Sequence, residues 1–402
     1  MLIANKHAAR IPYPDELRSI MSIERAEQSR RWLSGWSGIA RAATPLHELP
    51  GLAARLKLAW LGIKDESLRS PLGSFKALGA PVALLRQVLR LHPGFDPESV
   101  LAGRHAEALK DYTVISATDG NHGRALAAAA RDAGCRCVIV LHARVSAERE
   151  RAIAACGARI VRIAGNYDAS VTEAARLAAE HGWQVVSDTS YDGYEDIPRD
   201  VMQGYGVIAS ELVEQSGGRP PCTHVFLQGG VGGLAAGVIG YLWETYGARR
   251  PRFIVVEPDQ ADCLYQSALA QSPACASGSV DSIMAGLACG EVSPLAWRFL
   301  RNSVDHFMTI ADDAAIQAMR VLAAGGHGDI PIVAGESGAA GLAGLLVSMR
   351  DETLAGALGL DADSRVLVIN TEGATAPSVY EQCVGMTASS VLSRQEACLA
   401  RP

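Results

Sequence analysis

A lysine in a short polar stretch is the residue of this chain best suited to covalent chemistry. Lys76 lies in the segment 64–79, KDESLRSPLGSFKALG, and Ser74 is placed to cap a helix that begins at Phe75. In the first turn of that helix, the partly positive helix end would disfavour the Lys76 ammonium by roughly 0.3–1 kcal/mol and so lower its pKa. A lysine with a lowered pKa is a better nucleophile toward carbonyl carbons. An ordinary surface lysine at a helix start is the alternative that these residues alone leave open.

A first glycine-containing loop could bind a carboxylate. In SATDGNHGRAL, residues 116–126, an expected strand ends and a helix begins, with Asn121 and His122 between Gly120 and Gly123. The glycines permit close approach of the backbone, and the free N–H groups of a helix start can hold an anion. Asn121 could instead serve only as a helix cap.

A second loop is richer in glycine and suits a phosphate. QGGVGGLAAGVIG, residues 228–240, contains four glycines in the five positions 229–233, again between an expected strand and a helix. Such a row of N–H donors at a helix start is typical of phosphate sites. The loop lacks the Gly-Lys-Ser/Thr ending of a nucleoside triphosphate loop, whereas Glu257, at the end of the next strand, leaves a dinucleotide site open.

Three further polar residues are expected where strands end. Asp119 comes directly after the strand expected at 113–118, Asp188 lies at the end of the strand expected at 184–189, and Thr371 follows the last strand, in INTEGAT at 369–375. Ligands of open α/β sheets bind beyond the carboxyl ends of the strands, so these positions favour function. Each residue could equally cap or solvate its own turn.

The elements that must position these residues alternate between strands and helices. We expect one series with strands at 113–118, 137–142, 159–163 and 184–189, and helices at 123–133, 146–156 and 169–181. A second series has strands at 223–228, 253–257 and 365–370, and helices at 200–214, 234–246, 312–323 and 337–350. This alternation predicts an α/β protein of two doubly wound, parallel-sheet lobes with a ligand cleft between them. We expect residues 1–60 to be irregular, because prolines interrupt them, and they receive no chemical role.

Composition excludes several classes of partner. The chain has 402 residues and a formal charge of −6, which gives no electrostatic footprint for nucleic acid. Its nine cysteines form no CxxC pairs, the N-terminus has no signal-peptide pattern, and the longest apolar run, 227–243, is rich in glycine. We therefore expect a cytoplasmic protein with no membrane span that acts on a small molecule.

The order of lysine, asparagine loop, glycine loop and late hydroxyl resembles the fold-type II enzymes of pyridoxal 5′-phosphate, whose architecture is like the tryptophan synthase β-subunit. Within them, the lysine motif and TDGNHGR, SDT-x-x-x-GY, MQGY, IMAGLACGE and GESGA are similar to the diaminopropionate ammonia-lyase family. The similarity runs from about residue 30 to 375. It implies a large cofactor-binding domain from 1–80 and 195–402, and a small domain from 81–194.

The resemblance also implies roles for individual residues. Lys76 would hold the cofactor covalently, Asn121 would face its phenolic oxygen, and Thr371 would face its pyridine nitrogen. Asp119 would take the Cα proton of the D-isomer and Asp188 that of the L-isomer. The remaining expected contacts are with the cofactor phosphate, at Gly229, Gly230, Val231, Gly232 and Gly233, and with the substrate, at Ser116, Thr118, Gly120 and His122.

The implied reaction is the α,β-elimination of D- and L-2,3-diaminopropionate to pyruvate and two molecules of ammonia. A neutral hydroxyl at the pyridine nitrogen favours prompt loss of the β-substituent, and an ammonium needs no metal to leave. A serine/threonine dehydratase, a β-replacement enzyme and a catalytically silent ligand-binding protein are the alternatives. A homodimer is expected, whereas a disulfide between Cys263 and Cys289 is left open.

Overall fold

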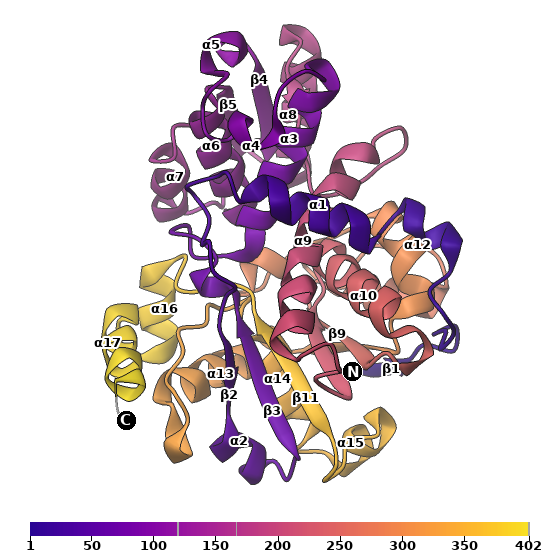
Figure 1. Cartoon of the computed structure of the whole chain (residues 1–402). Helices are drawn as coiled ribbons and strands as arrows, with labels where there is room; N and C mark the ends of the chain where they lie inside the picture. Colours follow the sequence, from indigo (N-terminus) through magenta and orange to yellow (C-terminus); the bar gives the residue numbers. More distant parts are fainter. Residues whose placement is uncertain (119, 166, 401–402) are drawn as a thin grey trace.

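The computed structural model describes residues 1–118, 120–165 and 167–400 of the chain, so Asp119 lies outside the described residues. Two open sheets, each flanked by helices, lie one above the other in Figure 1. Helices α1 and α9 cross the region between them. The expected α/β fold with two lobes is confirmed, whereas the domain boundaries at 80/81 and 194/195 stay a prediction.

The larger sheet runs in the order β1-β10-β9-β8-β11-β3-β2. Its inner strands pair in parallel, while β1 and β2 pair antiparallel with β10 and β3 at the two edges. Residues 1–60, which we expected to be irregular, thus contribute both edge strands. The strands are β1 Leu2–Ala4, β2 Leu46–Glu48, β3 Trp60–Asp65, β8 His224–Gln228, β9 Arg252–Pro258, β10 His306–Ile310 and β11 Arg365–Asn370.

The smaller sheet is wholly parallel, in the order β6-β5-β4-β7. It consists of β4 Thr113–Ala117, β5 Arg136–Leu141, β6 Arg159–Arg162 and β7 Gln184–Val185. Strand β7 is shorter than we expected, because only Gln184 and Val185 pair with β4 before the chain turns away. Asp188 therefore lies beyond the strand instead of at its end.

The helices fill the layers on both sides of the two sheets (Figure 1). Most predicted helices agree with the observed ones to within a few residues, the usual uncertainty at helix ends. The helices are α1 Ile23–Leu33, α2 Pro50–Arg55, α3 Ala80–Leu91, α4 Pro97–Val100, α5 Ala106–Leu109, α6 Asn121–Ala133, α7 Ala147–Ala154, α8 Tyr167–His181, α9 Asp196–Gln215, α10 Gly233–Tyr246, α11 Cys263–Ala270, α12 Pro294–Ser303, α13 Asp312–Ala324, α14 Ala340–Ser348, α15 Glu352–Leu358, α16 Pro377–Val384 and α17 Ala388–Leu399.

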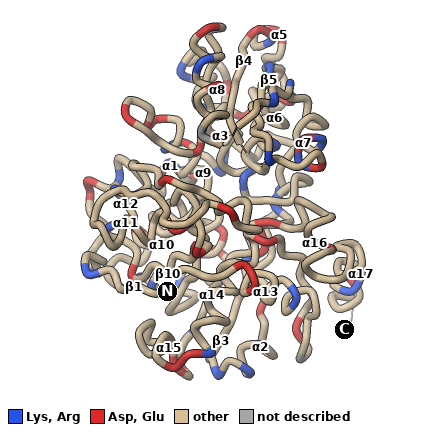
Figure 2. The backbone as a smooth tube through the Cα atoms, turned by 180° about the vertical axis from the view of Figure 1, so that it is seen from behind, with Lys and Arg blue, Asp and Glu red and all other residues tan. Residues whose placement is uncertain are grey.

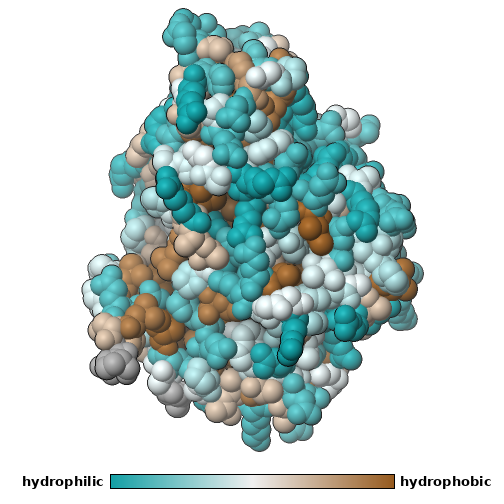
Figure 3. All heavy atoms as spheres, in the orientation of Figure 1, coloured by the Kyte–Doolittle hydropathy of each residue, from teal (hydrophilic) through white to brown (hydrophobic). Residues whose placement is uncertain are grey.

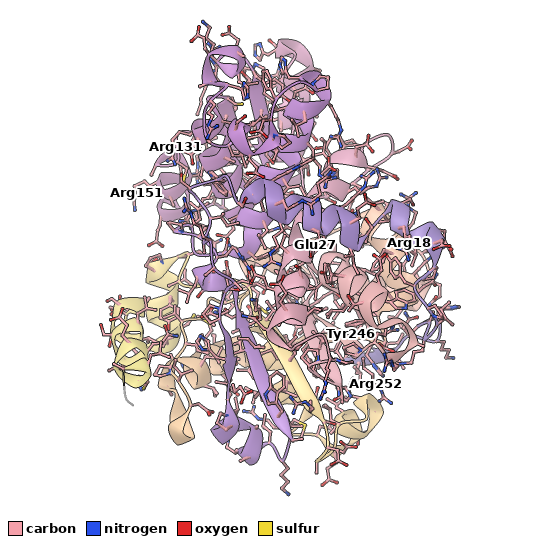
Figure 4. All side chains as sticks on the ribbon, in the orientation of Figure 1. Arg18, Glu27, Arg131, Arg151, Tyr246 and Arg252 are labelled. Atoms are coloured by element: carbon pink, nitrogen blue, oxygen red, sulfur yellow. The ribbon has the colours of Figure 1, made fainter. Side chains whose placement is uncertain are left out.

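Helix α9 is the structural centre of the molecule, because α1, α3 and α10 all pack against it. Glu27 of α1 accepts hydrogen bonds from Ser210 of α9 (2.6 Å) and Tyr241 of α10 (2.7 Å), and Figure 4 shows this glutamate between the three helices. Gly204 lets α9 approach the lysine segment closely, since a Cβ there would lie only 2.0 Å from the Leu78 carbonyl oxygen. Helix α9 therefore packs directly against the segment that carries Lys76.

The charged half of the 64–79 motif forms a buried ionic network. Lys64 Nζ lies 2.7 Å from Glu211 Oε2 of α9, and Arg69 binds both Glu211 (2.6 Å) and Glu66 (2.8 Å). Thr44 donates a 2.6 Å hydrogen bond to Glu66. Buried charges are stable only when paired, so this network anchors the start of the lysine segment to α9.

The surface carries mixed charge. Figure 2 shows basic and acidic residues interspersed along both lobes, and Figure 3 shows apolar residues gathered around the C-terminal helices. Leu392 and Leu399 of α17 are exposed there. No helix in the described part of the chain is long and apolar enough to cross a membrane.

Candidate active site

A cavity of about 770 Å³ lies between the two sheets, and most of the predicted site residues line it. Those that line it are Lys76, Thr118, Gly120, Asn121, His122, Asp188, Gly229, Gly230, Val231, Gly233 and Thr371. Two others do not reach it: Ser116 is fully buried behind the wall, and Gly232 packs toward Leu300 and Ala296. Asp119 is outside the part of the chain that the structure describes.

Lys76 lies in a 3₁₀ turn, Phe75–Leu78, and not in the first turn of an α-helix. Ser74 forms no side-chain cap there, so the expected capping is wrong. The segment is fixed instead by tertiary contacts, because the Phe75 N–H donates a 3.0 Å hydrogen bond to the carbonyl oxygen of Thr371. The rings of Phe75 and Tyr205 flank the lysine, with centroids 5.3 Å and 5.7 Å from Nζ.

Asp188 is the direct partner of Lys76, with Oδ2 only 2.5 Å from Nζ. Burial is the largest single effect on the pKa of Lys76 and lowers it, but the Asp188 carboxylate and Tyr205 act together against burial and raise this pKa above its ordinary value. Burial likewise would raise the pKa of Asp188, whereas Lys76 and His122 hold it well below its usual range. The expected low pKa of Lys76 is therefore wrong for the free amine, since a close ion pair outweighs a weak helix-end effect.

The asparagine loop is held by side chains on both sides. Thr118 Oγ1 accepts hydrogen bonds from the N–H groups of Gly120 (3.2 Å) and Gly123 (3.4 Å). His122 Nε2 lies 2.9 Å from the Val186 carbonyl oxygen, and burial lowers the pKa of this imidazole. A neutral His122 donates from Nε2, which leaves Nδ1 as an acceptor 3.8 Å from Asp188 Oδ2.

The glycine loop leads directly into α10. Gly230 and Gly232 have φ values of +60° and +98°, a left-handed conformation that favours glycine. A Cβ at Gly229 would lie 2.5 Å from Glu257 Cγ, so no larger residue fits there. The loop and the first N–H groups of a 14-residue helix provide the concave donor surface that a phosphate requires.

The side chain of Glu257 packs against this loop at Gly229. Both of its carboxylate oxygens accept backbone hydrogen bonds, from Leu264 (2.9 Å) and Tyr265 (2.8 Å) at the start of α11. Burial raises the pKa of Glu257 to about 8. Glu257 therefore has a structural role and is not available to bind the ribose of a dinucleotide, which argues against the dinucleotide site that the sequence left open.

Sequence reasoning missed several residues at the cavity. Tyr205, Ser337 and Glu372 line it, as does Arg149, whose Nη2 lies 2.9 Å from the buried Glu336. Three of them lie in stretches already singled out, MQGY, GESGA and INTEGAT, so a signal for them existed. Arg149 lies in none of the motifs that the sequence analysis singled out.

The cysteine pair left open by the sequence is not joined. Neither Cys263 nor Cys289 is part of a disulfide in the described structure, and Cys263 is buried. Its Sγ lies 3.5 Å from the Gly230 carbonyl oxygen and 3.7 Å from Glu257 Oε1. The Cys263 thiol therefore packs beneath the glycine loop.

The side chains around the cavity fit pyridoxal phosphate. Lys76 offers an amine for the aldehyde, the glycine loop offers donors for the phosphate, and Thr371 offers a hydroxyl at the end of β11. Gly230 leaves open space, since a Cβ there would meet nothing closer than 3.5 Å. No described feature of the cavity conflicts with this cofactor.

Comparisons with known proteins agree with this fit. The family model described as pyridoxal-phosphate dependent enzyme matches residues 39–372. A diaminopropionate ammonia-lyase of Salmonella typhimurium is 41% identical over 355 residues, which cover 85% of this chain and 88% of that protein.

Solved structures extend the similarity to the whole fold. The Escherichia coli diaminopropionate ammonia lyase in complex with an aminoacrylate-PLP azomethine reaction intermediate is 37% identical, with a TM-score of 0.85 and 96% of each chain covered. The same enzyme in complex with D-serine is 38% identical, with the same TM-score and coverage. The chain therefore belongs to the pyridoxal-phosphate-dependent enzymes and, within them, to the diaminopropionate ammonia-lyase family.

Proposed function

We propose that the enzyme eliminates the β-amino group of D- and L-2,3-diaminopropionate and that water then hydrolyses the unsaturated product, releasing the α-amino group, which yields pyruvate and two molecules of ammonia. The observation that carries this proposal is the Lys76–Asp188 pair in a cavity that faces a glycine loop. The family supports it, because the Escherichia coli relative was solved both with an aminoacrylate intermediate and with a D-amino acid.

The bound cofactor supplies electron withdrawal from the substrate Cα, which makes loss of its proton feasible. The residues of this chain supply binding and proton transfer. The loop 229–233 and the start of α10 would bind the phosphate, and Asn121 and Thr371 would orient the ring. The N–H groups around Gly120 and His122 would hold the substrate carboxylate.

Asp188 is suited to act as a base. It is a carboxylate at neutral pH because Lys76 and His122 lower its pKa against the effect of burial, and its basicity would rise if the lysine ammonium beside it were no longer present. We assign it the Cα proton of the L-isomer, and assign Asp119 that of the D-isomer. Lys76 is the alternative base if one group serves both isomers.

Two experiments test these assignments. Borohydride reduction followed by peptide mapping should attach the cofactor to Lys76, and attachment to another lysine would refute the site. Asp188→Asn should slow L-isomer turnover by about 10²–10⁴, and Asp119→Asn that of the D-isomer, because general-base catalysis is lost. Equal effects on both isomers would refute the two-base assignment.

We also propose that the enzyme acts in the cytoplasm as a homodimer. The apolar residues around α16 and α17 support a protein interface, since exposed apolar patches often mark one. Sedimentation analysis tests the oligomeric state, and a monomer at micromolar concentration would refute it.

A further inference from the structure

Glu372 is a buried carboxylate at the cavity with no cationic partner in the described part of the chain. It is 4% exposed and follows Thr371 at the end of β11. Among the described residues it forms no ion pair, whereas Asp188 is paired with Lys76 and the neighbouring Glu336 with Arg149. Buried carboxylates are normally neutralised by a cation, so a charge partner is missing here.

The carboxylate of Glu372 is held in place by three donors. The Ser337 N–H donates to Oε1 at 3.2 Å, and Oε2 accepts from Thr375 Oγ1 at 3.1 Å and from the Asn121 amide. Gly335 leaves room for this side chain, because a Cβ there would lie 3.1 Å from Glu372 Cγ and 3.3 Å from its carboxyl carbon. A carboxylate offers about four acceptor positions, so three donors leave room for one more.

The neighbourhood carries an excess of negative charge. Burial, together with the nearby charge of Glu372, raises the pKa of Glu336 to about 7. Among the described residues, Arg149 forms an ion pair with Glu336, and no cation forms one with Glu372. A small cation delivered to the cavity would therefore be stabilised beside Glu372.

We propose that Glu372 binds the β-ammonium of the substrate and so selects diaminopropionate over amino acids with a neutral β-substituent. This inference rests on the proposed function, which places a substrate with a second ammonium in this cavity. The hydroxyl of serine carries no charge, so it cannot replace the ammonium as the partner of Glu372.

The same contact assists departure of the leaving group. A neighbouring carboxylate favours the protonated form of the β-amine. When the Cα proton passes to the base, its electron pair forms the Cα–Cβ double bond, and the Cβ–N bond breaks with its pair on nitrogen. The –NH3⁺ group thus leaves as neutral ammonia without an added acid.

The test compares two substrates on the cofactor-loaded enzyme. Glu372→Gln keeps the size of the side chain but removes its charge, so kcat/KM for diaminopropionate should fall about 10- to 100-fold while that for D-serine changes by less than about threefold. Glu291→Gln, which removes an exposed carboxylate at the cavity, is the matched control. It should leave the ratio of the two kcat/KM values unchanged.

Equal losses for both substrates would overturn the proposal, because Glu372 would then act through Asn121 or the surrounding frame. No change for either substrate would also overturn it. If Glu372→Gln fails to retain the cofactor, Glu372→Asp is the second variant, because it keeps the charge but shortens the side chain by one methylene. It should lower the ratio of kcat/KM for diaminopropionate to kcat/KM for D-serine. The proposed function fails separately, if the wild-type enzyme releases no ammonia from diaminopropionate.

Discussion

Replacing Asp188 by asparagine should make Lys76 a weaker base in the cofactor-free enzyme. The Asp188 carboxylate lies 2.5 Å from Nζ and raises the lysine pKa against the effect of burial. A charge-assisted hydrogen bond contributes about 1.5–3 kcal/mol. At about 1.4 kcal/mol per pKa unit, its loss should lower the pKa of Lys76 by about one to two units.

Cofactor capture reports this change, because only the neutral amine attacks the aldehyde. Uptake by the apoenzyme is followed through the visible absorbance of the bound cofactor, and we expect its pH midpoint to fall by about one to two units. Asp192 is an exposed carboxylate at the same cavity, so Asp192→Asn is the control for the loss of one negative charge there. An unchanged midpoint in Asp188→Asn would refute the role of the ion pair.

Three further variants test the supporting structure. Gly229→Ala should weaken cofactor binding, measured by titration, because its Cβ would meet Glu257 at 2.5 Å, whereas Gly94→Ala meets open space and should not. Glu211→Gln should lower the free energy of unfolding, measured in urea, by about 3–5 kcal/mol, because it leaves the buried cations Lys64 and Arg69 without their partner. Glu107→Gln removes one member of an exposed ion pair and should lower the free energy of unfolding by less than about 1 kcal/mol. Burial raises the pKa of Glu257 from 4.5 to about 8, so between these two pH values the folded state binds a proton that the unfolded state has lost. The free energy of unfolding should therefore fall as the pH rises from 4.5 to about 8. Glu257→Gln should flatten this slope by up to about 1.4 kcal/mol per pH unit.

The alternation of strands and helices was predictable because it rests on local hydrophobic pattern. The short edge strands β1 and β2 were not, since three residues carry too little pattern and only pairing with β10 and β3 defines them. Lys64 looked like part of a reactive motif, yet its partner Glu211 lies 147 positions away. Such contacts are set by the fold and not by local sequence.

The environment of Lys76 shows the same limit. A local helix-end effect of about 0.3–1 kcal/mol was the only influence visible in the sequence. The contact with Asp188, 112 positions away, is stronger and has the opposite sign. The residue was predictable, but the direction of its pKa was not.

Product analysis with the wild-type enzyme tests the central claim most directly. Each 2,3-diaminopropionate consumed should give one pyruvate and two ammonia, with serine a much poorer substrate and no added nucleophile incorporated. Serine turnover equal to or faster than that of diaminopropionate would identify a dehydratase, and incorporation of a second nucleophile would identify a β-replacement enzyme; either result would contradict the account.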